Sequence, residues 1–412
     1  MHKKIFLLLG GNKLNYGILK KFHNKGYLIY VVDWNEKPQM TGDKHYRIDV
    51  KNSDAIINAL KKDKVLDKVE FAYSSIDLAV PSVAKLNREL GLKTITEEGL
   101  KYSSSKSKMA AKWNEFGLLN KISTKYTEFN DDIFELNKTM KLIIKPDNSA
   151  SSRGITIISQ NSARDFIVSA FNKAKEEASD DIVVVEEFVE GTEFTVEMIG
   201  DSYGNVCVYA ISRKTHTQNT DNNRIATKLH YNSVSDELQN KIAEFGIRCY
   251  KALGFSSSLG HLEVILKDDG TISPVEIGAR SSGFIASDLV DIASGADFLA
   301  DLIDVQNGAR VENGLHKQSD KSSMYFFYDF PDNSVVRKEC SLMDFVDKSI
   351  TSRYSDRANI ILNRVFKKID NDNARLGFEI LEGPASVMTH EYINQKEQEM
   401  LDCMLGRVVD VL

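Results

Sequence analysis

The sequence predicts an α/β protein with more than one domain, and three observations support this. Residues 1–100 alternate short apolar strands with helices, which is the pattern of a small parallel sheet covered by helices. The middle of the chain, by contrast, contains strands that follow one another closely, as in antiparallel hairpins. After Gly308 the chain becomes strand-rich and charged. At 412 residues it is also longer than one core usually supports.

The composition is that of an ordinary globular protein, with 42% hydrophobic and 27% charged residues. The net charge is −6 with both signs interspersed, so no basic face indicates nucleic-acid binding. No apolar stretch is long enough for a membrane span, and the apolar run near the start is too short for a signal peptide. We therefore expect a cytoplasmic protein that binds neither nucleic acid nor membranes. Four scattered cysteines lack metal or disulfide spacing and are expected to be reduced thiols: Cys207, Cys249, Cys340 and Cys403.

The N-terminal elements follow from short apolar runs punctuated by glycine. The predicted strands are Ile5–Leu9, Leu28–Asp33 and Val69–Ser74, and the predicted helices are Tyr16–Lys25, Asp54–Lys61 and Ala79–Leu90. A dinucleotide site would use a glycine turn such as Gly10-Gly11-Asn12 and a ribose ligand at the position of Asp33. The complete motif Gly-x-Gly-x-x-Gly is absent, however. An NAD oxidoreductase is therefore an alternative that this region supports weakly.

The middle of the chain contains three further helices and several strands. The predicted helices are Lys106–Phe116, Ser162–Ala178 and Ser235–Leu253, and the predicted strands are Met140–Ile144, Ile155–Ser159, Ile182–Val185, Glu193–Ile199 and Val206–Ser212. Arg213–Lys228 is rich in Asn, Thr and basic residues, which predicts a mobile loop. Its basic side chains either steer an anionic substrate or are simply solvated: Arg213, Lys214, Arg224 and Lys228.

Two glutamates mark the next predicted element, a β-hairpin. Strands at Leu259–Leu266 and Thr271–Ile277 flank the turn Lys267–Gly270, which places Glu263 and Glu276 opposite each other or one pair apart. Opposed Cβ atoms lie roughly 5 Å apart, and like charges in such a pair are destabilising. A shared divalent cation removes that repulsion, and carboxylate oxygens suit Mg²⁺ together with substrate phosphates. The alternative is two solvated glutamates at a sheet edge.

Lys145 ends an apolar strand, directly before Pro146, and precedes the small-residue loop Asp147–Gly154. Backbone N–H groups and hydroxyls in such a loop can cover phosphate oxygens. The alternative is a surface lysine beside an ordinary polar turn. The Walker A pattern is absent, so the loop is not a P-loop.

A strand that breaks at Glu186 into Glu187-Phe-Val-Glu-Gly-Thr-Glu193 exposes main-chain groups that can read an adenine edge. Glu186 can accept from the adenine amino group, Glu187 and Val189 can offer main-chain contacts, and Glu193 can accept from ribose hydroxyls. The alternative is an acidic surface turn.

His261 shares a strand face with Glu263, and we expect it to form hydrogen bonds rather than ligate metal. Arg280 ends the second hairpin strand, where it can stabilise negative charge near a metal. The alternative is a surface arginine.

Five stretches occur in an order that resembles the ATP-grasp superfamily, and most nearly its carboxylate–amine ligases, such as D-alanine–D-alanine ligase, L-amino acid ligases and the carbamoyl phosphate synthetase large chain. The resemblance covers residues 1–308. The stretches are Tyr73–Pro81, Lys106–Met109 with Gly117, Ile144–Pro146 with Ser151–Gly154, Glu186–Glu193, and His261–Glu263 with Glu276–Arg280.

The resemblance implies a pre-ATP-grasp α/β domain at 1–100, an ATP-grasp domain at 101–308 and a C-terminal cap region at 309–412. The ATP-grasp domain would comprise a small lid subdomain at about 140–190 and a larger antiparallel-sheet subdomain. Many family members have Asn two residues after the second metal glutamate, where this chain has Gly278. That difference is expected to weaken one metal site.

The resemblance also implies site roles. Lys106 and Lys145 would bind the α- and β-phosphates of ATP, and Arg280 would meet the γ-phosphate or an acyl phosphate. The residues that cover the phosphates would be Ser151, Ser152 and Gly154. The residues that bind adenine would be Glu186, Glu187 and Val189, and Glu193 would bind the ribose. Glu263 and Glu276 would bind one or two Mg²⁺, or alternatively Mn²⁺.

The implied activity is ATP-dependent joining of a small-molecule carboxylate to an amine through an acyl phosphate, with release of ADP and phosphate. An amino acid is the expected type of substrate, and a homodimer is the expected assembly. A purine-pathway type of ligase or carboxylase is the enzymatic alternative. A nucleotide-binding regulatory protein without turnover is the alternative from another class.

Overall fold

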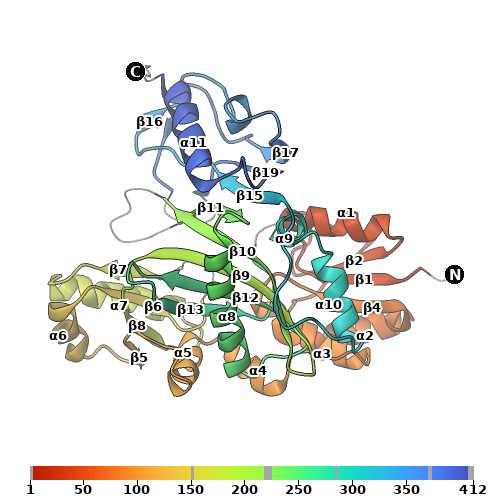
Figure 1. Ribbon diagram of the computed structural model, residues 1–412. Helices are drawn as coiled ribbons and strands as arrows, with labels where there is room; N and C mark the ends of the chain where they lie inside the picture. The colour runs from red at the N-terminus through yellow and green to blue at the C-terminus, as the bar shows by residue number, and fades with distance from the viewer. Residues whose placement is uncertain (1–2, 150–152, 218–224, 284–285, 370–373, 407–412) are drawn as a thin grey trace.

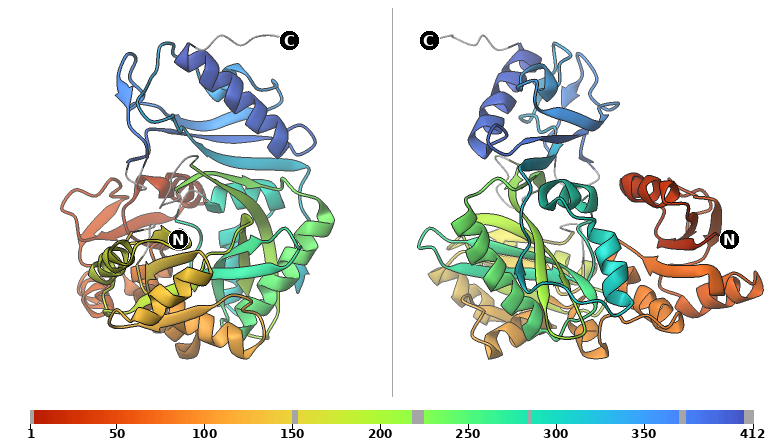
Figure 2. Two further views of the ribbon diagram at one scale, coloured as in Figure 1. Left: turned by 90° about the vertical axis from the view of Figure 1, so that its left-hand side faces the viewer. Right: turned by 45° about the vertical axis from the view of Figure 1, so that its right-hand side comes forward.

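A computed structural model describes residues 3–149, 153–217, 225–283, 286–369 and 374–406 (Figure 1). Three principal sheets organise these residues. The first contains the N-terminal strands, the second is a small antiparallel sheet, and the third is a large sheet through the centre of the molecule. Figures 1 and 2 show the large sheet between the small sheet with its helices and the N-terminal sheet.

The first sheet is parallel throughout, as predicted. Its strands in spatial order are β3 (Lys44–Arg47), β2 (Leu28–Asp33), β1 (Ile5–Leu9) and β4 (Val69–Tyr73), and its helices are α1 (Tyr16–Asn24), α2 (Ser53–Lys62) and α3 (Val80–Glu89). Strand β1 is entirely apolar and entirely buried, because helices cover both faces of the sheet. Phe6 packs with Phe22 of α1 on one face, and Leu7 packs with Ile56 of α2 on the other.

The glycine turn after β1 is fixed from within the protein. A carboxylate oxygen of Asp33 accepts a hydrogen bond from the N–H of Gly11 at 2.8 Å, and the other accepts from Asn35. Asp33 therefore has a structural role in holding this turn.

The small sheet is antiparallel and carries its own core. Its strands in spatial order are β5 (Ser123–Tyr126), β8 (Val183–Glu187), β6 (Leu142–Pro146) and β7 (Thr156–Ile158), and its helices are α6 (Asp131–Thr139) and α7 (Arg164–Glu177). Ile144 and Val185 pack against Ile167 and Phe171 of α7. Two short helices, α4 (Glu97–Tyr102) and α5 (Lys106–Glu115), precede this sheet.

The large sheet has nine strands within the part of the chain that the structure describes. In spatial order they are β13 (Ile272–Gly278), β12 (Ser258–Leu266), β9 (Thr192–Gly200), β10 (Val206–His216), β11 (Ala226–Tyr231), β15 (Lys321–Phe327), β19 (Phe378–Pro384) and β17 (Thr351–Asp356), with β14 (Gly314–Leu315) beside β10. Helix α8 (Asp236–Ala252) covers one face, where Ile242 packs with Val196 and Leu262. Helices α9 (Ala286–Ser294) and α10 (Phe298–Gln306) join α1 in another shared core.

The C-terminal residues continue this sheet through β15, β19 and β17, and helix α11 (His390–Leu405) packs beside them (Figure 2). Two short strands, β16 (Ser334–Val335) and β18 (Val365–Phe366), pair separately. The division into domains at 100 and 308 stays a prediction. No helix in the described ranges is long and apolar enough to cross a membrane.

The prediction of a mobile loop at Arg213–Lys228 was wrong at both ends. Strand β10 continues to His216, and β11 begins at Ala226 with Lys228 inside it. The polar composition misled the prediction because these residues pair between β10 and β11 as strands despite their polarity. The middle of the segment, including Arg224, lies outside the described residues.

Candidate functional site

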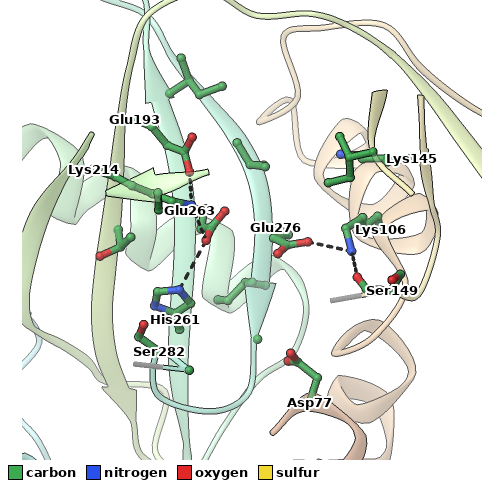
Figure 3. A pocket seen from close by; sticks show the side chains of 18 of the residues that line it. Asp77, Lys106, Lys145, Ser149, Glu193, Lys214, His261, Glu263, Glu276 and Ser282 are labelled. Carbon is green, nitrogen blue, oxygen red and sulfur yellow. Dashed lines mark hydrogen bonds and ion pairs between the residues drawn. The ribbon is translucent and has the colours of Figure 1, made fainter. Parts of the chain in front are cut away.

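One cleft of about 1150 Å³ is lined by residues of the small sheet, of the large sheet and of the segment that follows β4 of the N-terminal sheet. It joins Lys106 and Lys145 on one wall to Glu263 and Glu276 on the other (Figure 3). These residues lie far apart in the sequence, so the cleft is a product of the tertiary fold. A cleft of this size accommodates a nucleotide-sized ligand.

Strands β12 and β13 form the predicted hairpin, and Glu263 pairs directly with Glu276 across it. Both carboxylates point into the cleft (Figure 3). Lys214 Nζ lies 2.9 Å from Glu263, and Lys106 Nζ lies 2.9 Å from Glu276. Each glutamate therefore has its own ammonium partner, which offsets the repulsion expected of the pair.

Both glutamates are held in the ionised form. Burial alone would raise the pKa of Glu263, but Lys214 and His261 lower it to about 2. Burial likewise opposes ionisation of Glu276, and Lys106 lowers its pKa below the ordinary value. Two adjacent ionised carboxylates facing a cleft are a donor set that fits Mg²⁺, with further oxygens supplied by a substrate. No group of three or more His, Cys, Asp and Glu side chains suited to a metal occurs among the described residues.

His261 forms hydrogen bonds, as expected, and its partner is a buried glutamate. Its Nδ1 lies 2.6 Å from Glu197, and its Nε2 lies 3.6 Å from Glu263. Burial would lower the pKa of His261, but the Glu197 carboxylate raises it to about 9. Tyr231 also donates to Glu197, at 3.2 Å. His261 is thus an imidazolium ion on the cleft wall at neutral pH.

Lys145 and Glu186 form a buried ionic triad with a third residue, Lys121. The Glu186 carboxylate lies 2.7 Å from Lys145 Nζ and 2.6 Å from Lys121 Nζ, and it accepts from Ser123 Oγ at 3.0 Å. All three ionic side chains are at most 4% exposed. Burial opposes the charge on Glu186, but the two lysines lower its pKa to about 2. The triad carries a net positive charge at one end of the cleft.

Lys106 is positioned by the N-terminus of α5. Ser105 is the N-cap residue and donates to Asp147 at 2.6 Å, while the N–H of Ser107 donates to the same carboxylate at 2.6 Å. Lys106 Nζ also donates to the carbonyl of Ser149 at 2.9 Å (Figure 3). This lysine therefore links α5, the hairpin and the loop after β6.

Two of the residues expected to cover phosphates, Ser151 and Ser152, lie outside the described residues. Gly154 has φ +71°, a conformation that favours glycine, and a Cβ there would lie 3.0 Å from Pro146 and Glu177. The positive φ and the short distance to Glu177 of α7 are structural reasons for glycine at this position.

The expected adenine segment lies on the cleft wall. Glu187 and Val189 both line the cleft, and Val189 is buried. The N–H of Glu187 donates to the carbonyl of Ile122 at 3.0 Å, so that group is already occupied. Any main-chain contact from Glu187 to a ligand must use another atom.

Glu193 is bound by two basic side chains from β10. Lys214 Nζ lies 2.5 Å from one carboxylate oxygen, and His216 Nε2 lies 3.2 Å from the other. Burial opposes ionisation, but these neighbours lower the pKa of Glu193 well below its ordinary value. Lys214 thus bridges Glu193 and Glu263, because β9 lies between β10 and β12.

Arg280 is paired with a residue from the N-terminal part of the chain. Its Nε and Nη2 donate to the two carboxylate oxygens of Asp77 at 2.7 and 2.6 Å, and its Nη1 donates to the carbonyl of Ser281 at 2.8 Å. Burial would lower the pKa of Arg280, and Asp77 raises it instead, so the guanidinium stays charged.

The sequence analysis did not single out Lys121, Asp77 or Glu197. Asp77 follows the carboxyl end of a parallel strand, a position where ligands bind in such sheets, so that signal was present. The residues around Lys121 and Glu197 did not indicate a functional role, because the sequence near a buried charge does not show which distant residue it will pair with.

Comparison with known proteins finds a domain match, related ligases and solved structures of the same fold. Residues 138–288 match the model of the ATP-grasp domain. The D-alanine–D-alanine ligase of Buchnera aphidicola subsp. Schizaphis graminum is 26% identical over 217 residues, which cover 48% of this chain and 63% of that protein. The chain spans about half to two thirds of the length of the curated relatives it matches.

Solved structures share the fold over nearly the whole chain. The L-amino acid ligase from Bacillus licheniformis is 15% identical with a TM-score of 0.71, covering 98% of each chain. The biotin carboxylase domain of the Hydrogenobacter thermophilus 2-oxoglutarate carboxylase, in complex with MgADP, ADP and bicarbonate, is 14% identical with a TM-score of 0.68, covering 92% of this chain and 86% of that one. These matches agree with the resemblance drawn from the order of motifs: residues 138–288 match the ATP-grasp domain, and the solved structures share the fold of the chain.

Proposed function

We propose that this protein is an ATP-dependent carboxylate–amine ligase that forms an amide or peptide bond and releases ADP and phosphate. The observation that carries the proposal is the pairing of Glu263 with Glu276 in a cleft that also contains Lys106, Lys145 and Arg280. The relatives named above as ligases support the same reaction class.

ATP would lie between the small sheet and the large sheet. Lys145 and Lys106 supply positive charge for its α- and β-phosphates, and Glu186 and Glu193 face its adenine and ribose. The lysines are now engaged with Glu186 and Glu276, so a triphosphate would compete for ammonium groups that are already held in place. The segment at 140–190 would act as the lid, since Lys106 already reaches the Ser149 carbonyl.

Glu263 and Glu276 would hold one or two Mg²⁺, which when bound neutralise charge on the phosphates. The carboxylate substrate then attacks the γ-phosphorus, giving an acyl phosphate and ADP. The amine attacks the acyl carbon, a C–N bond forms, and phosphate leaves. Positioning and charge neutralisation dominate phosphoryl transfer, which fits a cleft rich in paired cations and carboxylates.

Replacing Glu276 with Gln tests the proposal, because it removes the charge and keeps the shape of the side chain. We expect ADP release in a screen of carboxylates crossed with amines to fall by at least about 100-fold. Circular dichroism should show an unchanged fold. Glu128→Gln is the matched control, since Glu128 is 84% exposed and does not line the cleft.

An active Glu276→Gln variant would contradict the metal assignment. A wild-type protein that binds ATP but releases no ADP with any pair of substrates would instead support a regulatory nucleotide-binding role.

A further inference from the structure

Lys214 lies between two carboxylates of the cleft that come from different strands. Its Nζ is 2.5 Å from Glu193 Oε1 and 2.9 Å from Glu263 Oε1, and Figure 3 shows the lysine bridging these two residues. Only 15% of the Lys214 side chain is exposed. Lys214 is therefore a built part of the cleft wall and not a solvated lysine at its edge.

The register of three neighbouring strands sets this bridge. Lys214 of β10 is paired with Glu193 of β9, and Thr195 of β9 is paired with Glu263 of β12. Neighbouring strands lie about 4.8 Å apart, so Lys214 extends across β9 to reach a carboxylate two strands away. That reach needs a long side chain, and arginine is the other long side chain that carries a permanent positive charge.

The two lysines that neutralise the opposed glutamates are held differently. Lys106 Nζ contacts Glu276 and also donates to a neutral group, the Ser149 carbonyl. Lys214 Nζ, by contrast, donates to two carboxylates. If another cation takes Glu263, the ammonium of Lys214 still has Glu193 as a partner. Glu193 is thus the anchor of Lys214, and Glu263 is the partner that can be exchanged.

An ammonium group and a divalent cation compete for the same carboxylate. A metal ion at Glu263 would have Lys214 as a close neighbour of the same charge sign, and His261 Nε2 lies 3.6 Å from the same carboxylate oxygen. Repulsion between like charges at such distances opposes the binding of a metal ion by itself. Nucleotide phosphates relieve this repulsion, because they are anionic partners for both the metal ion and the ammonium group.

We propose that Lys214 makes metal binding at Glu263 depend on the nucleotide. Its ammonium neutralises Glu263 until a metal ion arrives together with phosphates, and it then pairs with phosphate oxygens while Glu193 keeps it in place. The inference rests on the proposed function, which assigns the metal to Glu263 and Glu276. It adds the order of binding, in which the metal and the nucleotide enter together rather than the metal first.

Replacing Lys214 with Met tests this order, because the variant removes the charge and keeps most of the length of the side chain. The probe is Mn²⁺, whose free concentration is measured by electron paramagnetic resonance. We expect the Kd for Mn²⁺ alone to fall by at least about tenfold, because Glu263 loses its competing cation. The Kd for the Mn²⁺ complex of β,γ-methylene ATP should rise instead, because the phosphates lose one of their cations.

The changes of opposite sign separate this role from a structural one, since a variant that only disturbed the fold would weaken the binding of both ligands. Lys214→Arg keeps the charge and the reach, so its Kd for Mn²⁺ alone should stay as high as that of wild type. Lys214→Gln is a second neutral variant for the case that Lys214→Met does not fold. Lys241→Met is the matched control, because Lys241 is exposed on α8 and does not line the cleft.

A folded neutral variant of Lys214 that binds Mn²⁺ alone no more tightly than wild type would overturn the inference and leave the ligase function standing. Tighter binding of both ligands would also overturn it, because Lys214 would then have no role towards the phosphates. If the wild-type protein does not bind the metal–nucleotide complex at all, the proposed function itself fails.

Discussion

Lys121 illustrates how a single buried side chain sets the charge of the cleft. Without it, Lys145 and Glu186 would neutralise each other and leave no net charge where phosphates are expected to bind. With it, Glu186 is shared by two ammonium groups and stays ionised. Burial lowers the pKa of Lys145 more than Glu186 raises it, and the nearby charge of Lys121 acts in the same direction.

Replacing Lys121 with Met should therefore weaken nucleotide binding. The variant removes the net positive charge of the triad but fills the same space, so we expect the Kd for ADP, measured by calorimetry, to rise about tenfold. Lys125→Met is the control, because Lys125 is exposed on β5, the strand that follows Lys121 in the chain. Equal Kd values for wild type and the Lys121 variant would show that the triad does not contribute to the nucleotide site.

At the scale of elements, α11 contacts the large sheet through buried polar groups. Some of these groups are uncharged, and the others form an ion pair. His230 of β11 and His390 of α11 have ring centroids 6.2 Å apart. Lys228 donates to Asn394 at 2.7 Å and pairs with Glu397. Burial lowers the pKa of His230 to about 3 and that of His390 to about 4, with nearby positive charges adding to the effect.

These histidines predict acid sensitivity of α11. An unfolded histidine takes up a proton as the pH falls below 6.5, whereas the folded ones stay neutral down to about pH 4 and pH 3. Stability should therefore be complete above pH 6.5 and fall progressively towards pH 4, by up to about 1.4 kcal/mol per pH unit for each fully buried histidine.

Thermal unfolding between pH 7 and pH 4.5 measures this effect. His390→Gln should give a shallower loss of stability on acidification than wild type, because Gln does not titrate. His23→Gln is the control, since His23 is exposed on α1. If His390→Gln and wild type lose stability in parallel, His390 does not contribute to the acid sensitivity.

At the scale of the whole molecule, the N-terminal sheet is joined to the large sheet by a common core and by ion pairs. Phe22 of α1 belongs to the same hydrophobic cluster as Leu289 of α9. Lys21 Nζ lies 2.5 Å from both Asp291 and Asp297. Burial raises the pKa of Asp291 to about 6, although Lys21 acts to lower it. The position of Asp77 in the cleft depends on this attachment.

Replacing Lys21 with Met should lower the free energy of unfolding by about 1–2 kcal/mol at pH 8, because two partly buried carboxylates lose their shared cation. The difference should shrink below pH 6, where Asp291 becomes protonated. Denaturant unfolding at both pH values measures it, with Lys20→Met as the control at an exposed neighbouring position. An equal difference at the two pH values would contradict the role given to Asp291.

Several features were predictable because they depend on local patterns. The apolar run at β1 predicted a buried strand, and the spacing around the turn at 267–270 predicted Glu263 and Glu276 opposite each other or one pair apart; the structure has them opposed. The order of motifs predicted the ATP-grasp domain that residues 138–288 match. The length of β10 was not predictable, since its polar end is stabilised by pairing with β11 rather than by its own sequence.

The sequence by itself determined the kinds of elements, the two glutamates on facing hairpin strands and the ATP-grasp domain at 138–288, because strand alternation, turn length and motif order are properties of neighbouring residues. Tertiary structure alone decided which charges meet: Asp77 with Arg280, Lys121 with Glu186, and Glu197 with His261. The members of each pair are separated by dozens of residues or more, and a buried ion is stable only beside a partner that the folded chain brings to it.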